Sequence, residues 1–247
     1  MVSDVSLSDA VDEIGRLGFA ILKRALPYGD IDRAKAALVA ELERTDLAGS
    51  WLESRGVVYA ARNLLAGPPV IANLWRTPAL IELLSRVLGP EFGVVRGLYF
   101  DKPPERSWSL PWHKDLSIAV ADNSLPSERF RNPTLKAGVP HVVAPADVLE
   151  QMLTLRIHLD DASDENGPLQ VIPGSHCAVT ELSADTLPSL TIYAKSGDVL
   201  AMRPLLSHAS GNSVSGTKLH RRIVHFEFAS SDPLPDGFVW HTFVAGL

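Results

Sequence analysis

Length, composition and charge limit what this chain of 247 residues can be. Its 46% hydrophobic and 21% charged residues are typical of a folded globular domain and argue against disorder or a coiled coil. The formal net charge is −6 and the basic residues are scattered, which gives no basic surface for nucleic acid or an anionic membrane. We therefore expect one domain over residues 1–247, a monomer or homodimer, with a small molecule as substrate.

Cysteine usage and the N-terminal sequence predict the compartment. The single cysteine, Cys177, allows no disulfide within the chain and favours a reducing environment. The N-terminal stretch MVSDVSLSDAVDEIG has no basic flank followed by an apolar run, and no apolar stretch in the chain approaches the roughly 20 residues of a membrane span. We expect a mature N-terminus, no membrane contact and a cytoplasmic location.

Helical patterns dominate the first 92 residues. Apolar residues recur at helical spacing over Ser8–Leu17, with Ser8 as the expected cap, and over Ile31–Leu42. A short strand is expected between them, at Phe19–Leu22. A third helix is predicted over Thr77–Leu88, because threonine can cap free amides and the proline that follows suits the first helical position. This part should support the remainder of the domain, residues 93–247.

The second part of the chain carries strand patterns separated by turn residues. A first strand is expected at Val94–Asp101, and five more at Thr154–Asp160, Pro168–Ile172, Leu190–Ala194, Asp198–Met202 and Arg222–Ala229. Helices followed by strands favour a mainly β fold with bracing helices, either a sandwich or a barrel. Apolar and polar residues alternate in the strand TLRIHLD, so its polar face either meets water or lines a cavity.

Residues 121–150 form an insertion in this pattern. They contain four prolines and few strand signals. Because a long loop inside a compact domain is uncommon and usually functional, we expect a lid or a binding loop here.

Metal-chelating spacing occurs more than once. A His-x-Asp pair lies at His113-Lys114-Asp115, within LPWHKDLSIAV, and another at His158-Leu159-Asp160, while residues 225–227 form a His-x-Glu. With eight histidines and twenty-nine acidic residues, one accidental match is expected, so position must decide. The first pair follows a proline near a strand end, where loops usually build sites, whereas the others lie within regular strands. This favours His113 and Asp115 modestly.

A third ligand and an arginine follow far downstream. His208 comes directly after the predicted strand GDVLAMRP, and Arg221 follows it at the start of the last predicted strand. Two histidines and one carboxylate are the ligand set that holds ferrous iron on one face and leaves the other face open. An arginine at the same barrel mouth could bind a carboxylate through two parallel hydrogen bonds.

At these residues the chain resembles the phytanoyl-CoA dioxygenase family of iron(II)- and 2-oxoglutarate-dependent oxygenases. The resemblance covers most of the chain and rests on LYFDKPPE, PWHKDL, LRIHLDDASDENGPLQVIPGSH, GDVLAMRP and HASGNSVSGTKLHRR. It implies a double-stranded β-helix, the jelly roll of cupin-like barrels, with iron(II) bound by His113, Asp115 and His208. It also implies that Arg221 holds the distal carboxylate of 2-oxoglutarate. Arg222 is the alternative, because neighbouring strand residues face opposite ways.

The resemblance further implies a reaction, in which a C–H bond of a small molecule is hydroxylated with O2 while 2-oxoglutarate yields succinate and CO2. Asp115 favours hydroxylation over the halogenation of relatives that lack this carboxylate. Further candidates for contact with 2-oxoglutarate are Ser210, Thr154, Lys102 and Tyr99. Candidates for contact with the substrate are Trp112, Lys114, Arg156, His158 and His141, whereas His176 is expected to be structural.

Two other functions remain open from the sequence. A cupin-like barrel can bind a metal and a small ligand without turnover. Alternatively, zinc at the same ligands could serve a hydrolase or isomerase, with His158 as the base.

Overall fold

The computed structural model describes residues 6–42, 51–54, 57–104, 107–178 and 187–247. Its frame is formed by antiparallel sheets, of which the largest has eight strands. In spatial order this major sheet comprises β1 (Phe19–Leu22), β12 (Val199–Met202), β9 (Met152–His158), β14 (Ile223–Ala229), β4 (Gly93–Phe100), β3 (Val57–Ala61) and β2 (Trp51–Ser54), with β15 (Val244–Ala245) paired to β4.

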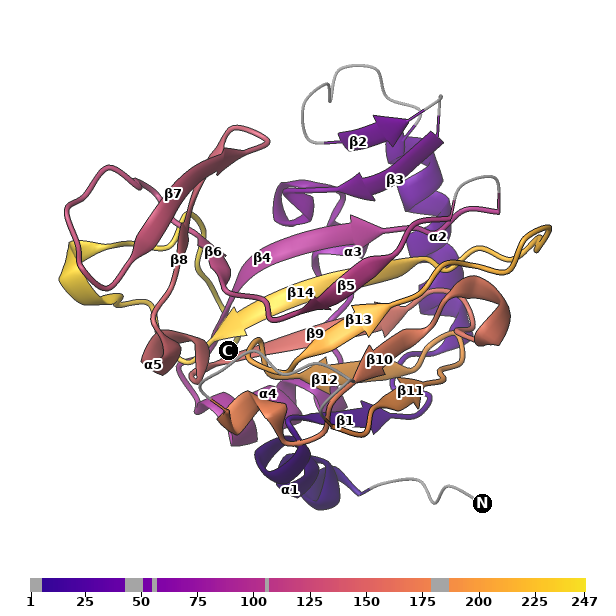
Figure 1. The fold of residues 1–247 in the computed structure, drawn as a ribbon, viewed down its shortest axis with the longest axis horizontal. Helices are drawn as coiled ribbons and strands as arrows, with labels where there is room; N and C mark the ends of the chain where they lie inside the picture. Colours follow the sequence, from indigo (N-terminus) through magenta and orange to yellow (C-terminus); the bar gives the residue numbers. More distant parts are fainter. Residues whose placement is uncertain (1–5, 43–50, 55–56, 105–106, 179–186) are drawn as a thin grey trace.

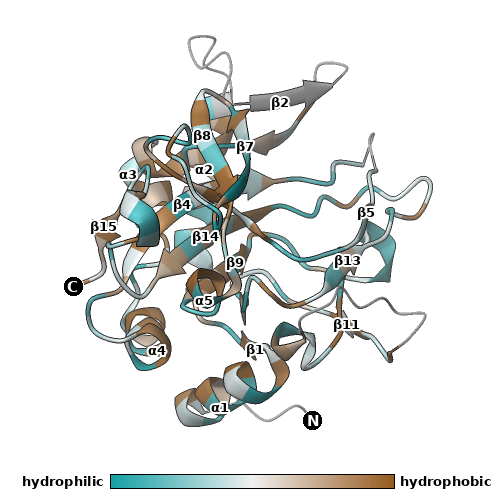
Figure 2. Cartoon of the chain, turned by 60° about the vertical axis from the view of Figure 1, so that its left-hand side comes forward, coloured by the Kyte–Doolittle hydropathy of each residue, from teal (hydrophilic) through white to brown (hydrophobic). Residues whose placement is uncertain are grey.

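A four-stranded minor sheet faces the major sheet. Its order is β11 (Leu190–Ile192), β10 (Leu169–Val171), β13 (His208–Ser210) and β5 (Leu110–His113). Figure 2 shows β5, β13 and β11 on one side of the molecule and β4 and β14 on the other. Two facing antiparallel sheets confirm the predicted mainly β jelly roll.

The N-terminal part combines helices with strands. The helices are α1 (Leu7–Leu17), α2 (Tyr28–Leu42), α3 (Pro69–Ala72) and α4 (Pro78–Leu88). Helix α4 begins after the predicted cap, because Thr77 accepts a hydrogen bond from the Leu80 amide. The expectation of a mostly helical support was incomplete, because β1, β2 and β3 also come from this part and join the major sheet.

Two predicted helix starts were too late. Helix α1 is capped by Ser6, whose hydroxyl accepts a hydrogen bond from the Asp9 amide at 3.2 Å. Ser8, the predicted cap, instead accepts a hydrogen bond from Arg86 of α4 at 3.1 Å. Helix α2 starts at Tyr28, three residues before the predicted Ile31. The prediction was late because the first turn of the helix carries few apolar residues.

The alternating strand β9 places its two faces in different environments. Leu155 and Ile157 belong to the main hydrophobic cluster together with residues of α1, α2 and α4. The intervening Arg156 lines a cavity between the two sheets. Of the two explanations left open by the sequence, the polar face of this strand therefore faces the barrel interior.

The insertion at 121–150 is not a loop with few strands. It forms a hairpin of β7 (Arg131–Lys136) and β8 (Val139–Val143), and β8 also pairs with β6 (Ser117–Ala119). Ala137 and Gly138 form its two-residue turn with φ angles of 51° and 76°, the positive values that tight hairpin turns require. These strands were missed because Pro133 and Pro140, a residue type that is uncommon within strands, hid the strand pattern. Figure 1 shows the hairpin extending from the barrel at upper left.

Short helices complete the described chain: α5 (Ala146–Leu149) and the 3-10 helices η2 (Leu64–Ala66), η3 (Asp164–Asn166), η4 (Ser175–Cys177) and η5 (Pro235–Gly237). No helix in the described ranges has the length and apolar character needed to cross a bilayer.

Candidate active site

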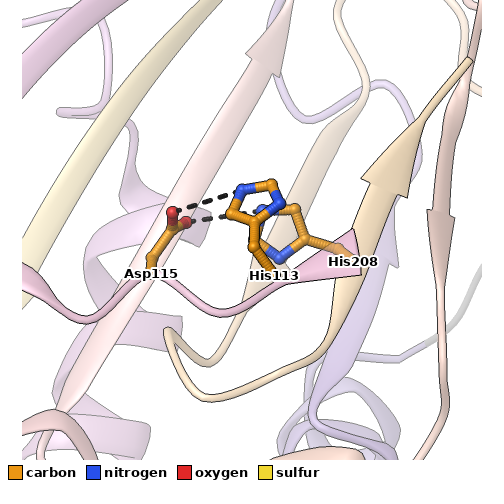
Figure 3. Close-up of side chains that lie close together, drawn as sticks. All are labelled: His113, Asp115 and His208. Atoms are coloured by element: carbon orange, nitrogen blue, oxygen red, sulfur yellow. Dashed lines mark ion pairs between the residues drawn. The ribbon is translucent and has the colours of Figure 1, made fainter. Parts of the chain in front are cut away.

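Strand pairing brings together three candidate metal ligands. His113, the last residue of β5, and His208, the first of β13, are direct partners in the antiparallel ladder, and their ring centroids lie 4.2 Å apart. Asp115 follows His113 by two residues, and its amide donates to the Pro204 carbonyl at 2.9 Å. One ligand atom from each of the three residues lies within 4.8 Å of the other two (Figure 3). This cluster has the composition and size of a metal site.

Backbone carbonyls fix how the two histidines present their rings. Nδ1 of His113 lies 2.7 Å from the Pro111 carbonyl, and Nδ1 of His208 lies 2.9 Å from the Leu206 carbonyl. A carbonyl only accepts, so each Nδ1 carries the hydrogen and each Nε2 lone pair is available to a metal. The Nε2 atoms lie 3.8 and 3.6 Å from the Asp115 carboxylate oxygens.

The protonation states also suit metal binding. Burial raises the pKa of Asp115, but His208 and neighbouring cationic groups outweigh this effect and lower the pKa to about 2. Burial lowers the pKa of His208 to about 4, although the Asp115 carboxylate acts in the opposite direction. At neutral pH the carboxylate is therefore charged and His208 is neutral, which are the forms that bind metals.

The three residues face a cavity of about 290 Å³ between the sheets. Its opposite wall is formed by the major sheet, including Arg156 of β9, His225 and Glu227 of β14, and Arg221 just before β14. A small polar ligand next to the metal ligands would therefore contact several charged groups.

Arg221 is held at one end of this cavity. Its backbone exchanges two hydrogen bonds with Lys102, at 3.2 and 3.3 Å. Its Nη1 donates to the Gly167 carbonyl, but its buried Nε has no partner among the described residues. Burial lowers the pKa of Arg221 to about 9, and nearby Arg156 adds to this shift. A buried guanidinium with spare donors and no bound carboxylate is suited to an anionic ligand.

Lys102 and Arg156 add positive charge around Arg221. The Lys102 ammonium is fully buried and donates to Ser210 Oγ at 3.1 Å and to the Gly167 carbonyl at 3.3 Å. Burial, together with Arg221 and Arg156, lowers the pKa of Lys102 to about 7. Arg156 is buried, its Nε has no partner in the described ranges, and burial lowers its pKa to about 10. An anion would compensate this charge.

Arg222, the alternative to Arg221, points elsewhere. Its Nε and Nη2 donate to the two carboxylate oxygens of Asp160 at 2.7 and 2.9 Å. Asp160 also pairs with Lys35 of α2 at 3.0 Å. The second His-x-Asp pair thus supplies the carboxylate of a structural ion pair, and only Arg221 lines the cavity.

The predicted contacts to 2-oxoglutarate divide into two groups. Ser210 lines the cavity on the same strand as His208. Thr154, Lys102 and Tyr99 do not line it, although all three are buried. The prediction for Tyr99 was wrong. Neighbouring residues of β4 face opposite ways, so Leu98 lines the cavity and Tyr99 packs into the main hydrophobic cluster on the other face.

Among the predicted substrate contacts, only Arg156 and Lys114 line the cavity. The Lys114 ammonium donates to the carbonyls of Ser175 and Ala178, at 3.0 and 2.8 Å, so it anchors the η4 segment and is not directed at a ligand. Trp112 and His158 do not line the cavity, which contradicts the substrate contacts and the role of base predicted for them.

His141 lies beside the cavity. It lines an adjoining space of about 180 Å³ that shares Arg62 and Arg96 with the cavity of the candidate site. Its Nδ1 contacts the Val139 carbonyl at 2.9 Å, and burial lowers its pKa to about 4. His176, expected to be structural, has Nε2 3.2 Å from the Gly15 carbonyl of α1.

Sequence reasoning missed several charged residues of the cavity wall. Three of them come from separate elements: Arg62 directly follows β3, Arg96 lies in β4 and Lys136 ends β7. The only sequence signal connected with them was the His-x-Glu pair. Its Glu227 forms an ion pair with Arg96 and lies 3.3 Å from His225 Nε2.

His158→Gln should make the fold less sensitive to acid. Neither ring nitrogen of buried His158 has a partner among the described residues, and burial, with Arg156 and Arg221 nearby, lowers its pKa from 6.5 to about 3. The unfolded chain therefore takes up a proton that the folded chain excludes, and stability present above pH 6.5 is lost as the pH falls toward 3.

Urea unfolding measures this effect. Between pH 7 and pH 5, the free energy of unfolding should fall by about 2 kcal/mol more in the wild type than in His158→Gln. An equal fall in both proteins would show that His158 is not neutral in the folded state.

Comparison with known proteins identifies the family. Residues 15–223 match the family model for phytanoyl-CoA dioxygenase (PhyH). The chain belongs to this family. It is 28% identical over 181 residues to L-proline trans-4-hydroxylase of Streptomyces griseoviridis, an alignment covering 72% of this chain and 59% of that protein. It is 25% identical over 182 residues to ectoine dioxygenase of Bordetella parapertussis, covering 70% of this chain and 51% of that protein.

The PhyH-family chain thus spans little more than half the length of these curated relatives. Solved structures share its fold. AviO1 from Streptomyces viridochromogenes has a TM-score of 0.68 at 23% identity, covering 95% of this chain and all of that one. EctD from S. alaskensis, solved with 2-oxoglutarate and 5-hydroxyectoine, has a TM-score of 0.69 at 18% identity, covering 93% of this chain and 78% of that one.

Proposed function

We propose that this protein is an iron(II)- and 2-oxoglutarate-dependent dioxygenase that hydroxylates a small molecule. One observation carries the proposal: the His113, Asp115 and His208 cluster faces the same cavity as Arg221, a buried arginine without a bound carboxylate. Membership of the PhyH family supports the same conclusion. So does a relative named L-proline trans-4-hydroxylase, which by its name oxidises a small molecule.

The metal fits the residues present. His113 and His208 would bind it through Nε2 and Asp115 through its carboxylate, while the Pro111 and Leu206 carbonyls keep the imidazoles oriented. Bound iron(II) would supply activation of O2, coupled to the conversion of 2-oxoglutarate to succinate and CO2. Two nitrogen ligands and one carboxylate leave room for this cosubstrate.

The cosubstrate fits the charge of the site. We assign its distal carboxylate to Arg221, with Ser210 as an additional hydroxyl donor. Lys102 holds Ser210 and Gly167, and thereby positions the end of the cavity where Arg221 lies. Arg156 adds a second uncompensated cation, so that a dianion such as 2-oxoglutarate offsets the buried positive charge.

Metal-dependent succinate formation tests the function. Metal-free protein should release succinate from 2-oxoglutarate only after addition of iron(II) in air, with equivalent consumption of O2, and a hydroxylatable substrate should increase the rate. Binding of metal and 2-oxoglutarate without succinate above a protein-free control would favour a binding protein. Activation by zinc alone, with no O2 consumed, would favour a hydrolase or isomerase.

A further inference from the structure

A second group of cations lies along the cavity from Arg221. Arg96 of β4 is the ladder partner of Glu227 of β14. Glu227 follows Arg221 by six residues, a separation of roughly 20 Å in an extended chain. Arg62 and Lys136 line the cavity together with Arg96, whose positive charge acts on both of them. The cavity therefore has two separate basic regions.

The charges of this second region do not balance. Glu227 is already used, because its carboxylate pairs with Arg96 and lies 3.3 Å from His225 Nε2. Arg62 forms no hydrogen bond or ion pair with any residue in the described ranges. Lys136 donates to the Ser117 hydroxyl at 2.9 Å, a neutral group. Glu227 also attracts Arg62 and Lys136, but this one carboxylate faces three cations, so the region keeps an excess of positive charge.

Leaving these charges together is costly unless a ligand offsets them. Arg62 and Lys136 are each half-buried, and burial lowers the pKa of both, with Arg96 adding to the shift. Like charges brought into a partly dehydrated cavity repel, and an anion bound between them would remove this repulsion. The region thus has the properties of an anion-binding site.

We propose that Arg62 and Lys136 bind an anionic group, a carboxylate or a phosphate, on the substrate of this protein. The proposal rests on the proposed function, because it places that group in the cavity of the candidate iron centre. The guanidinium of Arg62 supplies paired donors, and the ammonium of Lys136 supplies a point charge. Glu227 keeps Arg96 in place and is a positioning residue.

The hairpin positions this subsite, and the volume of the cavity limits the size of the ligand. Lys136 is the last residue of β7, directly before the Ala137-Gly138 turn, and the hairpin thereby brings it to the cavity wall. The cavity of about 290 Å³ is at the lower end of ligand pockets, which run from about 300 to 1,000 Å³. Because 2-oxoglutarate is assigned to the same cavity, the substrate should be a small organic acid or phosphate ester.

Binding without turnover tests the proposal. Zinc-loaded protein saturated with 2-oxoglutarate is titrated by calorimetry with cyclohexanecarboxylate, cyclohexyl phosphate and neutral cyclohexanecarboxamide, and with the same three derivatives of cyclopentane. We expect the wild type to bind at least one anion about tenfold or more tightly than the matching amide. The Arg62→Gln/Lys136→Gln double variant should lose this preference and keep its affinity for the amide.

A matched control and an independent assay separate the possible failures. Arg131→Gln removes an exposed cation from the same hairpin, outside the cavity, and should keep the preference. Anions that bind no better than amides, or a preference that survives in the double variant, would overturn the proposed subsite. Iron-dependent succinate release, measured on the same proteins loaded with iron(II) instead of zinc, shows separately whether the proposed function holds. A carboxylate preferred over the phosphate, or the reverse, identifies the anionic group.

Discussion

Asp115→Ala is expected to lower iron(II) affinity at least about 100-fold and to abolish iron-dependent succinate formation. The substitution removes the only carboxylate of the cluster and leaves His113 and His208 as ligands. The two remaining imidazoles are neutral ligands, so the iron loses both a ligand and the only negative charge in the cluster. Iron binding under anaerobic conditions and succinate release in air measure the two effects separately.

The second His-x-Asp pair provides a matched control. Asp160→Ala removes a carboxylate at the same spacing from a histidine, but this carboxylate pairs with Arg222 and Lys35. It should reduce the free energy of unfolding and leave iron affinity unchanged. Loss of iron binding in Asp160→Ala, with retention in Asp115→Ala, would show that the metal lies at the other pair.

Arg221→Met is expected to weaken binding of 2-oxoglutarate about 30-fold or more, because the distal carboxylate loses its charged partner. Binding of iron should not change. The same substitution should not destabilise the ligand-free protein, because it removes a buried charge that is repelled by Arg156 and has no acidic partner within the described chain. Calorimetry measures the affinity, and urea unfolding without ligand measures the stability.

The neighbouring arginine supplies the control for this prediction. Arg222→Met breaks the ion pair with Asp160, which is partly exposed to solvent, and should cost about 1 kcal/mol of stability. It should leave the affinity for 2-oxoglutarate unchanged. An equal loss of affinity in the two variants would mean that neither arginine holds the cosubstrate directly.

Local patterns placed His113 and His208 near strand ends and Arg221 near the start of the last strand. They did not predict β5 and β13, the two short strands that carry the histidines, and Arg221 lies two residues before β14. What local patterns do not contain is the register of distant strands. That His113 and His208 are direct ladder partners depends on the pairing of β5 with β13, which no nearby residue determines.

The errors have the same origin. Tyr99 and Leu98 alternate on β4, but the sequence does not indicate which of the two faces the cavity. Arg62 and Lys136 are far apart in the chain and meet only because the β7–β8 hairpin and β3 border the same cavity. A basic subsite assembled from single residues of separate elements leaves no motif.

One motif had a second role that only the structure reveals. The segment DENGPLQVIPGSH is one of those that carry the family resemblance, and it provides β10. Gly167 within it also accepts hydrogen bonds from both Arg221 and Lys102 through its carbonyl. An alanine Cβ at this position would lie 2.4 Å from the Gly211 carbonyl oxygen, at a φ of +64°. The motif therefore also positions the basic end of the cavity.

Anomalous diffraction at the iron edge tests the central claim most directly. Crystals grown without oxygen in the presence of iron(II) and 2-oxoglutarate should show one iron peak within bonding distance of His113, Asp115 and His208. The cosubstrate should chelate that iron, with its distal carboxylate on Arg221. An iron peak at His158 and Asp160, or no iron between His113 and His208, would contradict the proposed metal centre and the function built on it.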